Sequence, residues 1–256
     1  MRLKIFLEPK SNNFVLPINY NYHLSSAIYK IFLHGSKEVA TWLHEVGYKD
    51  EKGRKLKLFN FSNLMFSHYQ VENNLLKCFG MTSFIFSAPI ETNLVKYFID
   101  GIMKKPTFKI YLQSQTLIFR ITTIELQEEL KIEKQSDYSL MTPATVSIQN
   151  NAGDKKRIIY LKPIDDDYAF RLSKNLKKKF KILHNYEYDE DINISIKPES
   201  IKSKLITIKE GLPQEIKVKA YLFDFVLKSL PEIHRIAYYC GIGEKNSLGF
   251  GMIRKK

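Results

Sequence analysis

Tyr29 and His44 are two side chains whose types and positions could do proton chemistry. Each lies next to the apolar stripe of a predicted helix, because Tyr29 follows Ile28 and His44 follows Leu43 in VATWLHEVGY. Successive helical residues are rotated by about 100°, so both side chains are expected beside a buried face rather than within it. A tyrosine or histidine at such a border can serve as a general acid or base.

A lysine-rich loop, KDEKGRKLK at 49–57, follows His44. An ammonium group near a tyrosine and a histidine could stabilise the charge that develops on a phosphate ester, completing an acid, base and oxyanion-stabilising set. The sequence HEVGY lacks the second histidine of HExxH, because Tyr48 occupies its place, so a zinc protease is excluded. The remaining histidines stand alone, and a surface or packed structural role is favoured for His23, His34, His68, His184 and His234.

Glycines are concentrated in GIGEKNSLGFG, residues 241–251, which predicts that a ligand or another backbone segment approaches the main chain closely there. The spacing does not fit a dinucleotide-binding fingerprint, because Asn246 stands at the third glycine position. It does not fit a Walker A loop either, because Phe250 follows Gly249. Two interpretations stay open: a turn whose amides and Lys245 face a phosphate chain, or a hairpin with bulges.

The composition favours a polyanionic partner. The chain of 256 residues has 40 basic and 27 acidic side chains, a net charge of +13, which favours nucleic acid over an anionic membrane. Its two cysteines, Cys78 and Cys240, show no metal-ligand spacing, so neither a disulfide framework nor a zinc site is predicted. The N-terminus is too weakly apolar for a signal peptide and no segment is apolar enough to span a membrane, so we expect a cytoplasmic protein.

The hydrophobic pattern predicts an α+β fold with two tandem ferredoxin-like, or RRM-like, βαββαβ domains at 1–130 and 131–256. The first has strands at 2–9, 56–67, 81–90 and within 108–126, and helices at 20–33, 38–46 and 91–105. Residues 127–137 are predicted as a linker, with a continuing strand as the alternative. The second domain has strands in MTPATVSI, KRIIYLKP, INISIKP, KLITIKE and EIKVKAYLFDFV, a helix at 165–184, and a helix or strand at 228–240.

Taken together, these stretches resemble the CRISPR-associated endoribonuclease family of the RAMP superfamily, which cuts precursor CRISPR RNA within each repeat. The resemblance covers essentially the whole chain and is carried by RLKIFLEP, the helix ending in Tyr29, TWLHEV, KLKLF, LMTPATV and the terminal GIGEKNSLGFGMI. Its most specific element is the C-terminal glycine-rich loop, which in the family lies between the two ferredoxin-like domains and helps hold the RNA.

The resemblance implies Tyr29, His44 and Lys57 as catalytic residues, with Lys52 or Lys55 as alternatives for the lysine. It also implies an RNA-binding loop comprising Gly241, Gly243, Lys245, Asn246, Ser247, Gly249 and Gly251. The implied activity is metal-independent cleavage by the RNA's own 2′-hydroxyl, which leaves 2′,3′-cyclic phosphate and 5′-hydroxyl ends. No metal or other cofactor is expected, the partner is CRISPR repeat RNA, and other CRISPR effector subunits are further candidates. The alternative is a non-catalytic subunit that binds the repeat RNA.

Overall fold

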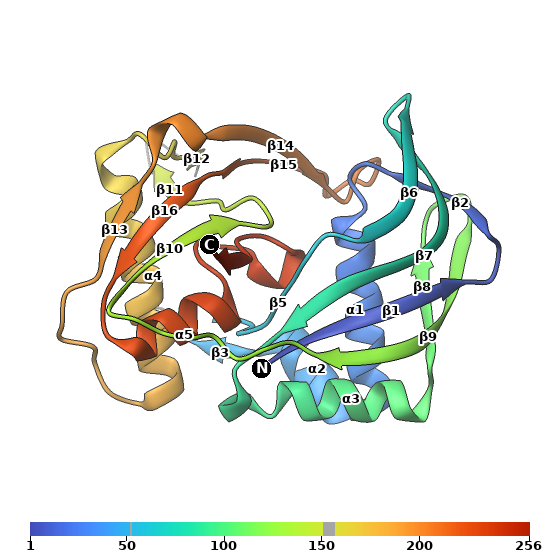
Figure 1. Cartoon of the computed structure of the whole chain (residues 1–256), viewed down its shortest axis with the longest axis horizontal. Helices are drawn as coiled ribbons and strands as arrows, with labels where there is room; N and C mark the ends of the chain where they lie inside the picture. Colours follow the sequence, from blue (N-terminus) through green and yellow to red (C-terminus); the bar gives the residue numbers. More distant parts are fainter. Residues whose placement is uncertain (52, 151–156) are drawn as a thin grey trace. The chain divides into compact units, whose positions relative to one another are not determined.

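The computed structural model describes residues 1–51, 53–150 and 157–256. The chain divides into two compact units, Met1–Glu128 and Glu129–Lys256. Each unit contains an antiparallel sheet and its own helices (Figure 1).

Unit 1, Met1–Glu128, is organised around a twisted sheet with the strand order β2-β7-β1-β9-β8, in which β5 and β6 also pair with β7. Within it, the order β6-β7-β1-β9 is that of a ferredoxin-like βαββαβ domain. Its strands are β1 (Arg2–Pro9), β2 (Asn13–Pro17), β5 (Asn60–Phe61), β6 (Met65–Glu72), β7 (Leu75–Ser87), β8 (Thr107–Tyr111) and β9 (Thr116–Leu126). A short separate ribbon pairs β3 (Tyr48–Lys49) with β4 (Lys55–Leu56).

The helices of unit 1 are α1 (Asn21–Gly35), α2 (Lys37–Glu45) and α3 (Leu94–Lys104), with a 3₁₀ turn at η1 (Ile90–Thr92). Helices α1 and α3 approach each other through glycines. A Cβ on Gly101 would lie 2.0 Å from the carbonyl oxygen of Ile31, and one on Gly35 would lie 2.1 Å from that of Tyr97. Gly101 therefore serves this close helix contact, although glycine is unfavourable inside a helix.

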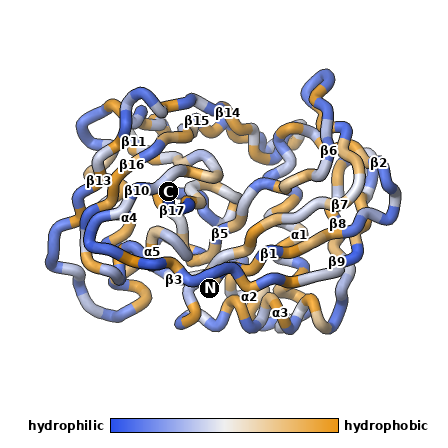
Figure 2. Tube along the Cα trace, in the orientation of Figure 1, coloured by the Kyte–Doolittle hydropathy of each residue, from blue (hydrophilic) through white to orange (hydrophobic). Residues whose placement is uncertain are grey.

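Aromatic side chains fill the core between the helices and the sheet of unit 1. Phe86 of β7 and Phe98 of α3 stack with their ring centroids 4.0 Å apart, and Phe32 of α1 packs against both. Figure 2 shows apolar stretches along these helices and strands. This packing fixes α1, the helix that carries Tyr29.

Unit 2, Glu129–Lys256, has a sheet with the order β13-β16-β10-β17, the second ferredoxin-like arrangement. Its strands are β10 (Gln135–Leu140), β13 (Asn193–Ile196), β16 (Asp224–Lys228) and β17 (Ile253–Lys255). The helices are α4 (Asp166–His184) and α5 (Pro231–Cys240), and the 3₁₀ turns are η2 (Pro198–Ser200) and η3 (Asn246–Leu248). Two hairpins complete it, β11 (Ser147–Asn150) with β12 (Arg157–Tyr160) and β14 (Lys202–Ile208) with β15 (Ile216–Leu222).

The predicted fold class is confirmed, and several element boundaries differ from prediction: strand β2 was not predicted, and the predicted strand at 56–67 is divided among β4, β5 and β6. Strand β10 begins at Gln135, inside the predicted linker. The prediction missed it because two of its buried positions hold serines, Ser136 and Ser139, which interrupt the apolar pattern. Ser139 Oγ donates to Asp224 Oδ1 at 2.6 Å. The stretch MTPATVSI is extended only from Ser147. The predicted strand EIKVKAYLFDFV is divided into β15 and β16, and 228–240 forms a helix from Pro231.

Candidate active site and glycine-rich loop

Tyr29 and His44 lie side by side in unit 1. Their ring centroids are 6.1 Å apart and the rings are nearly perpendicular, at 86°. Tyr29 is half-buried and its ring also packs edge-on against Phe59, at 5.6 Å, whereas His44 is exposed. The phenol is thus held by the core while the imidazole is open to a substrate.

The sequence around α2 produces this arrangement. Ser36 separates α1 from α2, and its Oγ caps α2 by accepting a hydrogen bond from the Val39 backbone amide at 3.3 Å. Leu43 is completely buried, so the next residue, His44, projects from the border of the buried face. The helix ends at Glu45, and Gly47 follows with a left-handed φ of 61°.

Lys57 lies at the end of α2 beside His44. Its Nζ donates to the His44 carbonyl oxygen at 3.2 Å. A Cβ on Gly47 would lie 3.2 Å from this Nζ, so the glycine leaves room for the lysine. Leu58 has a φ of 46°, unusual for a leucine, and is buried directly after Lys57, which turns the chain so that the lysine faces α2.

Burial, followed by the charge of Lys55, lowers the pKa of Lys57 to about 8. Below that pH the side chain is a cation at the His44 carbonyl oxygen, and a cation is what stabilisation of a phosphate anion requires. Of the two alternative lysines, Lys55 donates to the carbonyl oxygen of Glu45, and Lys52 lies outside the described residues.

The glycine-rich loop follows α5 in unit 2 (Figure 1), and its glycines serve close backbone contacts. A Cβ on Gly251 would lie 2.0 Å from the Ile242 carbonyl oxygen, and one on Gly243 would lie 2.6 Å from that of Thr145. Gly241, Gly249, Gly243 and Gly251 all have positive φ values, between 67° and 82°. Gly243 and Gly251 are therefore required by close approach of the protein's own backbone. Of the two causes that the sequence analysis considered for the glycines, a ligand or another backbone segment, this is the second.

A buried lysine holds the loop together. Lys179 of α4 donates from Nζ to the carbonyl oxygens of Gly241 and Gly243, at 2.8 and 3.3 Å, and to Asn246 Oδ1 at 2.7 Å. Burial lowers its pKa to about 8. The Asn246 amide nitrogen in turn donates to the carbonyl oxygens of Ile242 and Phe250, at 3.0 and 2.9 Å. The Asn246 side chain is thus part of the loop's internal hydrogen bonding.

Of the remaining loop side chains, one is hydrogen-bonded to a neighbouring strand and two are partly exposed. Glu244 accepts hydrogen bonds from the backbone amide and the hydroxyl of Ser147, at 3.0 and 2.7 Å, which ties the loop to β11. Lys245 and Ser247 are partly exposed, and Lys245 has a left-handed φ of 57° at the start of η3. Lys245 is therefore a partly exposed cation at the start of this turn.

Sequence reasoning missed Lys179, although the signal was present. The sequence analysis predicted the helix at 165–184 but assigned no role to this lysine. Lys179 continues the buried stripe Tyr168, Leu172 and Leu176 at helical spacing. A lysine on the apolar face of a helix needs buried acceptors, and the carbonyls of the glycine-rich loop supply them.

The two units define a protein of the tandem ferredoxin-like class, with Tyr29, His44 and Lys57 close together in the first unit and a glycine-rich loop near the C-terminus of the second. Residues 15–120 match the family model described as CRISPR-associated protein Cas6, N-terminal, and residues 126–255 match CRISPR associated protein Cas6, C-terminal. The chain belongs to the Cas6 family, which confirms the resemblance seen in the sequence.

The similarity to known proteins extends over nearly the full length of the chain. The chain is 23% identical to CRISPR-associated endoribonuclease Cas6 1 of Methanocaldococcus jannaschii, covering 98% of this chain and 92% of that protein. It is 24% identical to CRISPR-associated endoribonuclease Cas6 of Pyrococcus furiosus, covering 98% and 88%. A solved structure of a Cas6-related gene product from Pyrococcus furiosus has a TM-score of 0.83 and 25% identity, covering 100% of this chain and 98% of that one. None of the described helices is long and apolar enough to cross a bilayer.

Proposed function

We propose that this protein is a metal-independent endoribonuclease that cleaves precursor CRISPR RNA within its repeats. The observation that carries the proposal is the 6.1 Å separation of the Tyr29 and His44 rings, with Lys57 bonded to the carbonyl of His44. A general acid, a general base and a cation in this arrangement suit transfer of a phosphoryl group. The family membership and the names of the relatives support an RNA substrate.

In this mechanism the RNA supplies its own nucleophile. The 2′-hydroxyl upstream of the cut attacks the adjacent phosphorus as Tyr29 or His44 removes its proton, while the other residue, or His44 itself in a later step, protonates the leaving 5′-oxygen. The Lys57 ammonium stabilises the charge on the phosphorane-like transition state. The bond to the 5′-oxygen breaks as the bond to the 2′-oxygen forms, so the products carry a 2′,3′-cyclic phosphate and a 5′-hydroxyl.

We also propose that the glycine-rich loop binds the RNA, as the sequence analysis predicted. Lys245 is the loop side chain that best suits a phosphate contact, because it is a partly exposed cation, whereas the Asn246 amide is hydrogen-bonded within the loop. Replacing Lys245 with alanine should weaken repeat binding and lower the salt dependence of the affinity by roughly one phosphate contact. An unchanged dependence of log Kd on log salt would remove Lys245 from the interface.

The cleavage proposal is tested by incubating the protein with an end-labelled repeat RNA in excess EDTA. We expect cleavage to persist, the products to have the ends stated above, and one 2′-deoxy nucleotide just upstream of the cut to block the reaction. A divalent-metal requirement, or cleavage of the deoxy substrate, would refute attack by the 2′-hydroxyl. Tight repeat binding without cleavage would identify the alternative, a non-catalytic RNA-binding subunit. Action in the cytoplasm and association with other CRISPR effector subunits stay predictions.

A further inference from the structure

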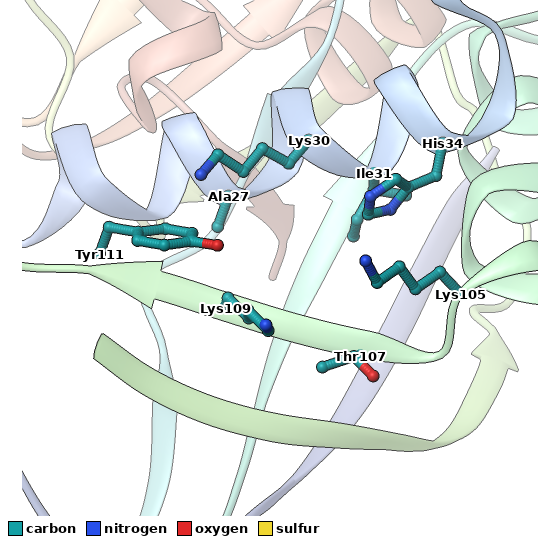
Figure 3. A pocket seen from close by; sticks show the side chains of 8 residues that line it. All are labelled: Ala27, Lys30, Ile31, His34, Lys105, Thr107, Lys109 and Tyr111. Carbon is teal, nitrogen blue, oxygen red and sulfur yellow. The ribbon is translucent and has the colours of Figure 1, made fainter.

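A small pocket lies between α1 and the edge strand β8 of unit 1 (Figure 3). Its volume is about 60 Å³, enough for a small tetrahedral anion, since one water needs roughly 10–15 Å³ on this measure. One face of α1 and alternate residues of the segment entering and forming β8 line it. They are Ala27, Lys30, Ile31 and His34 from α1, and Lys105, Thr107, Lys109 and Tyr111.

The α1–β8 pocket is strongly basic. Three of its eight lining residues are lysines and none is acidic. In the described part of the chain, Lys30, Lys105 and Lys109 form no ion pair with a carboxylate. Lys30 places its Nζ 3.2 Å from the centre of the Tyr111 ring, whereas Lys105 extends toward His34 (Figure 3). Three ammonium groups around one small pocket repel one another, and a bound anion would relieve this repulsion.

The pKa of His34 is affected by the positive charges of this pocket. Partial burial, and then the charges of Lys105 and Lys30, lower the pKa of His34. Its Nδ1 is buried and has no hydrogen-bond partner among the described residues. The neutral form of the His34 imidazole is therefore favoured, and its ring can donate or accept one hydrogen bond near the charges of Lys105 and Lys30. The sequence had predicted only a surface or packed structural role for this histidine.

We propose that the α1–β8 pocket is a phosphate-binding site that lies apart from the catalytic cluster. Lys30, Lys105 and Lys109 neutralise the anion, and the Thr107 hydroxyl and the His34 ring supply hydrogen bonds. The phosphate can come from the backbone of a bound RNA or from free phosphate, because both present the same oxygens. Neither source requires the cleavage proposed for Tyr29, His44 and Lys57.

The test follows the His34 ring by NMR during pH titration of the full-length His44→Ala protein, which prevents cleavage in the proposed mechanism. Inorganic phosphate and an oligouridylate without terminal phosphates are the two probes, at fixed ionic strength. We expect at least one probe to raise the pKa of His34 by roughly one unit, because a bound anion favours the imidazolium. Phosphate alone acting would identify the free ion, and oligouridylate acting would identify the RNA backbone.

Two adjacent lysines provide matched variants for this test. Lys105 lines the pocket, whereas Lys104 donates to the Gly35 carbonyl oxygen at 2.8 Å and does not line it. Lys104→Ala should preserve the response to the probe and Lys105→Ala should reduce it at least several-fold, although both remove one charge. No response in the parent protein, or an equal response in both variants, would overturn the proposal. Since the readout is His34 and not cleavage, failure here leaves the proposed endoribonuclease activity standing.

Discussion

The N-terminal cluster and the C-terminal glycine-rich loop are each built around a lysine whose burial lowers its pKa to about 8. Lys57 is half-buried and donates to one carbonyl oxygen, so its ammonium group can still meet a substrate. Lys179 is buried and donates to three oxygens of the loop. The same perturbed pKa therefore accompanies a candidate catalytic group in one region and a structural support in the other.

The two regions also differ in what their special residues do. In the N-terminal cluster, Gly47 and Leu58, which has a left-handed φ, position the Lys57 cation at the carbonyl oxygen of His44. In the glycine-rich loop, Gly243 and Gly251 admit the protein's own carbonyl oxygens. The glycines of this motif thus indicate tight backbone packing. A ligand would be contacted by side chains that remain exposed, such as Lys245.

Among the variants that would distinguish the roles of the two regions, His44→Ala is expected to have the largest effect, on the cleavage rate. If His44 transfers a proton, single-turnover cleavage of repeat RNA should fall roughly 10²–10⁴-fold, equivalent to about 3–5 kcal/mol of barrier. Repeat affinity and the melting temperature should hardly change, because the imidazole is exposed. His68→Ala is the matched control, since His68 is also an exposed histidine of unit 1 and lies on β6.

Equal rates for His44→Ala and wild type would remove His44 from the mechanism. A loss of affinity as large as the loss of rate would assign the residue to RNA binding instead. A similar rate loss in His68→Ala would show that the effect is not specific to His44.

The second effect is expected on stability, in the other region. Gly251 and Gly80 share a φ of 72°, but a Cβ on Gly251 would lie 2.0 Å from a carbonyl oxygen, whereas the nearest atom to one on Gly80 is 3.9 Å away. Gly80→Ala should therefore cost only the left-handed backbone penalty, about 1–2 kcal/mol. Gly251→Ala should cost about 2 kcal/mol more, measured as the difference in melting temperature.

Equal costs for the two glycine variants would show that the loop around Gly251 yields without strain. The idea that its glycines are fixed by internal packing would then fail. Reduced repeat binding by Gly251→Ala at a temperature where it stays folded would link that packing to RNA contact.

The sequence predicted the fold class because apolar periodicity and element order are local signals. It missed β10 because two serines, Ser136 and Ser139, occupy buried positions of that strand, and the hydrogen bond from Ser139 to Asp224 forms only in the folded sheet. It placed Tyr29 and His44 on the borders of two helices, but their 6.1 Å contact depends on the crossing of α1 and α2. It could not choose among Lys52, Lys55 and Lys57, because the direction of Lys57 depends on the turn at Leu58, and the sequence does not show that this leucine has a φ of 46°.

The smallest effect concerns pH and asks which of the two lysines acts in catalysis. If the protonated Lys57 stabilises the transition state, the cleavage rate should fall about tenfold per pH unit above pH 8, because its pKa is lowered to about 8. Lys57→Arg should retain some activity and lose this alkaline decline, because arginine stays protonated. Lys179→Met is the matched control: it removes the other lysine with a pKa of about 8, and the decline should persist in the fraction that stays folded. A decline that vanishes in Lys179→Met but persists in Lys57→Arg would exchange the roles of the two lysines, and with them the roles assigned to the two regions.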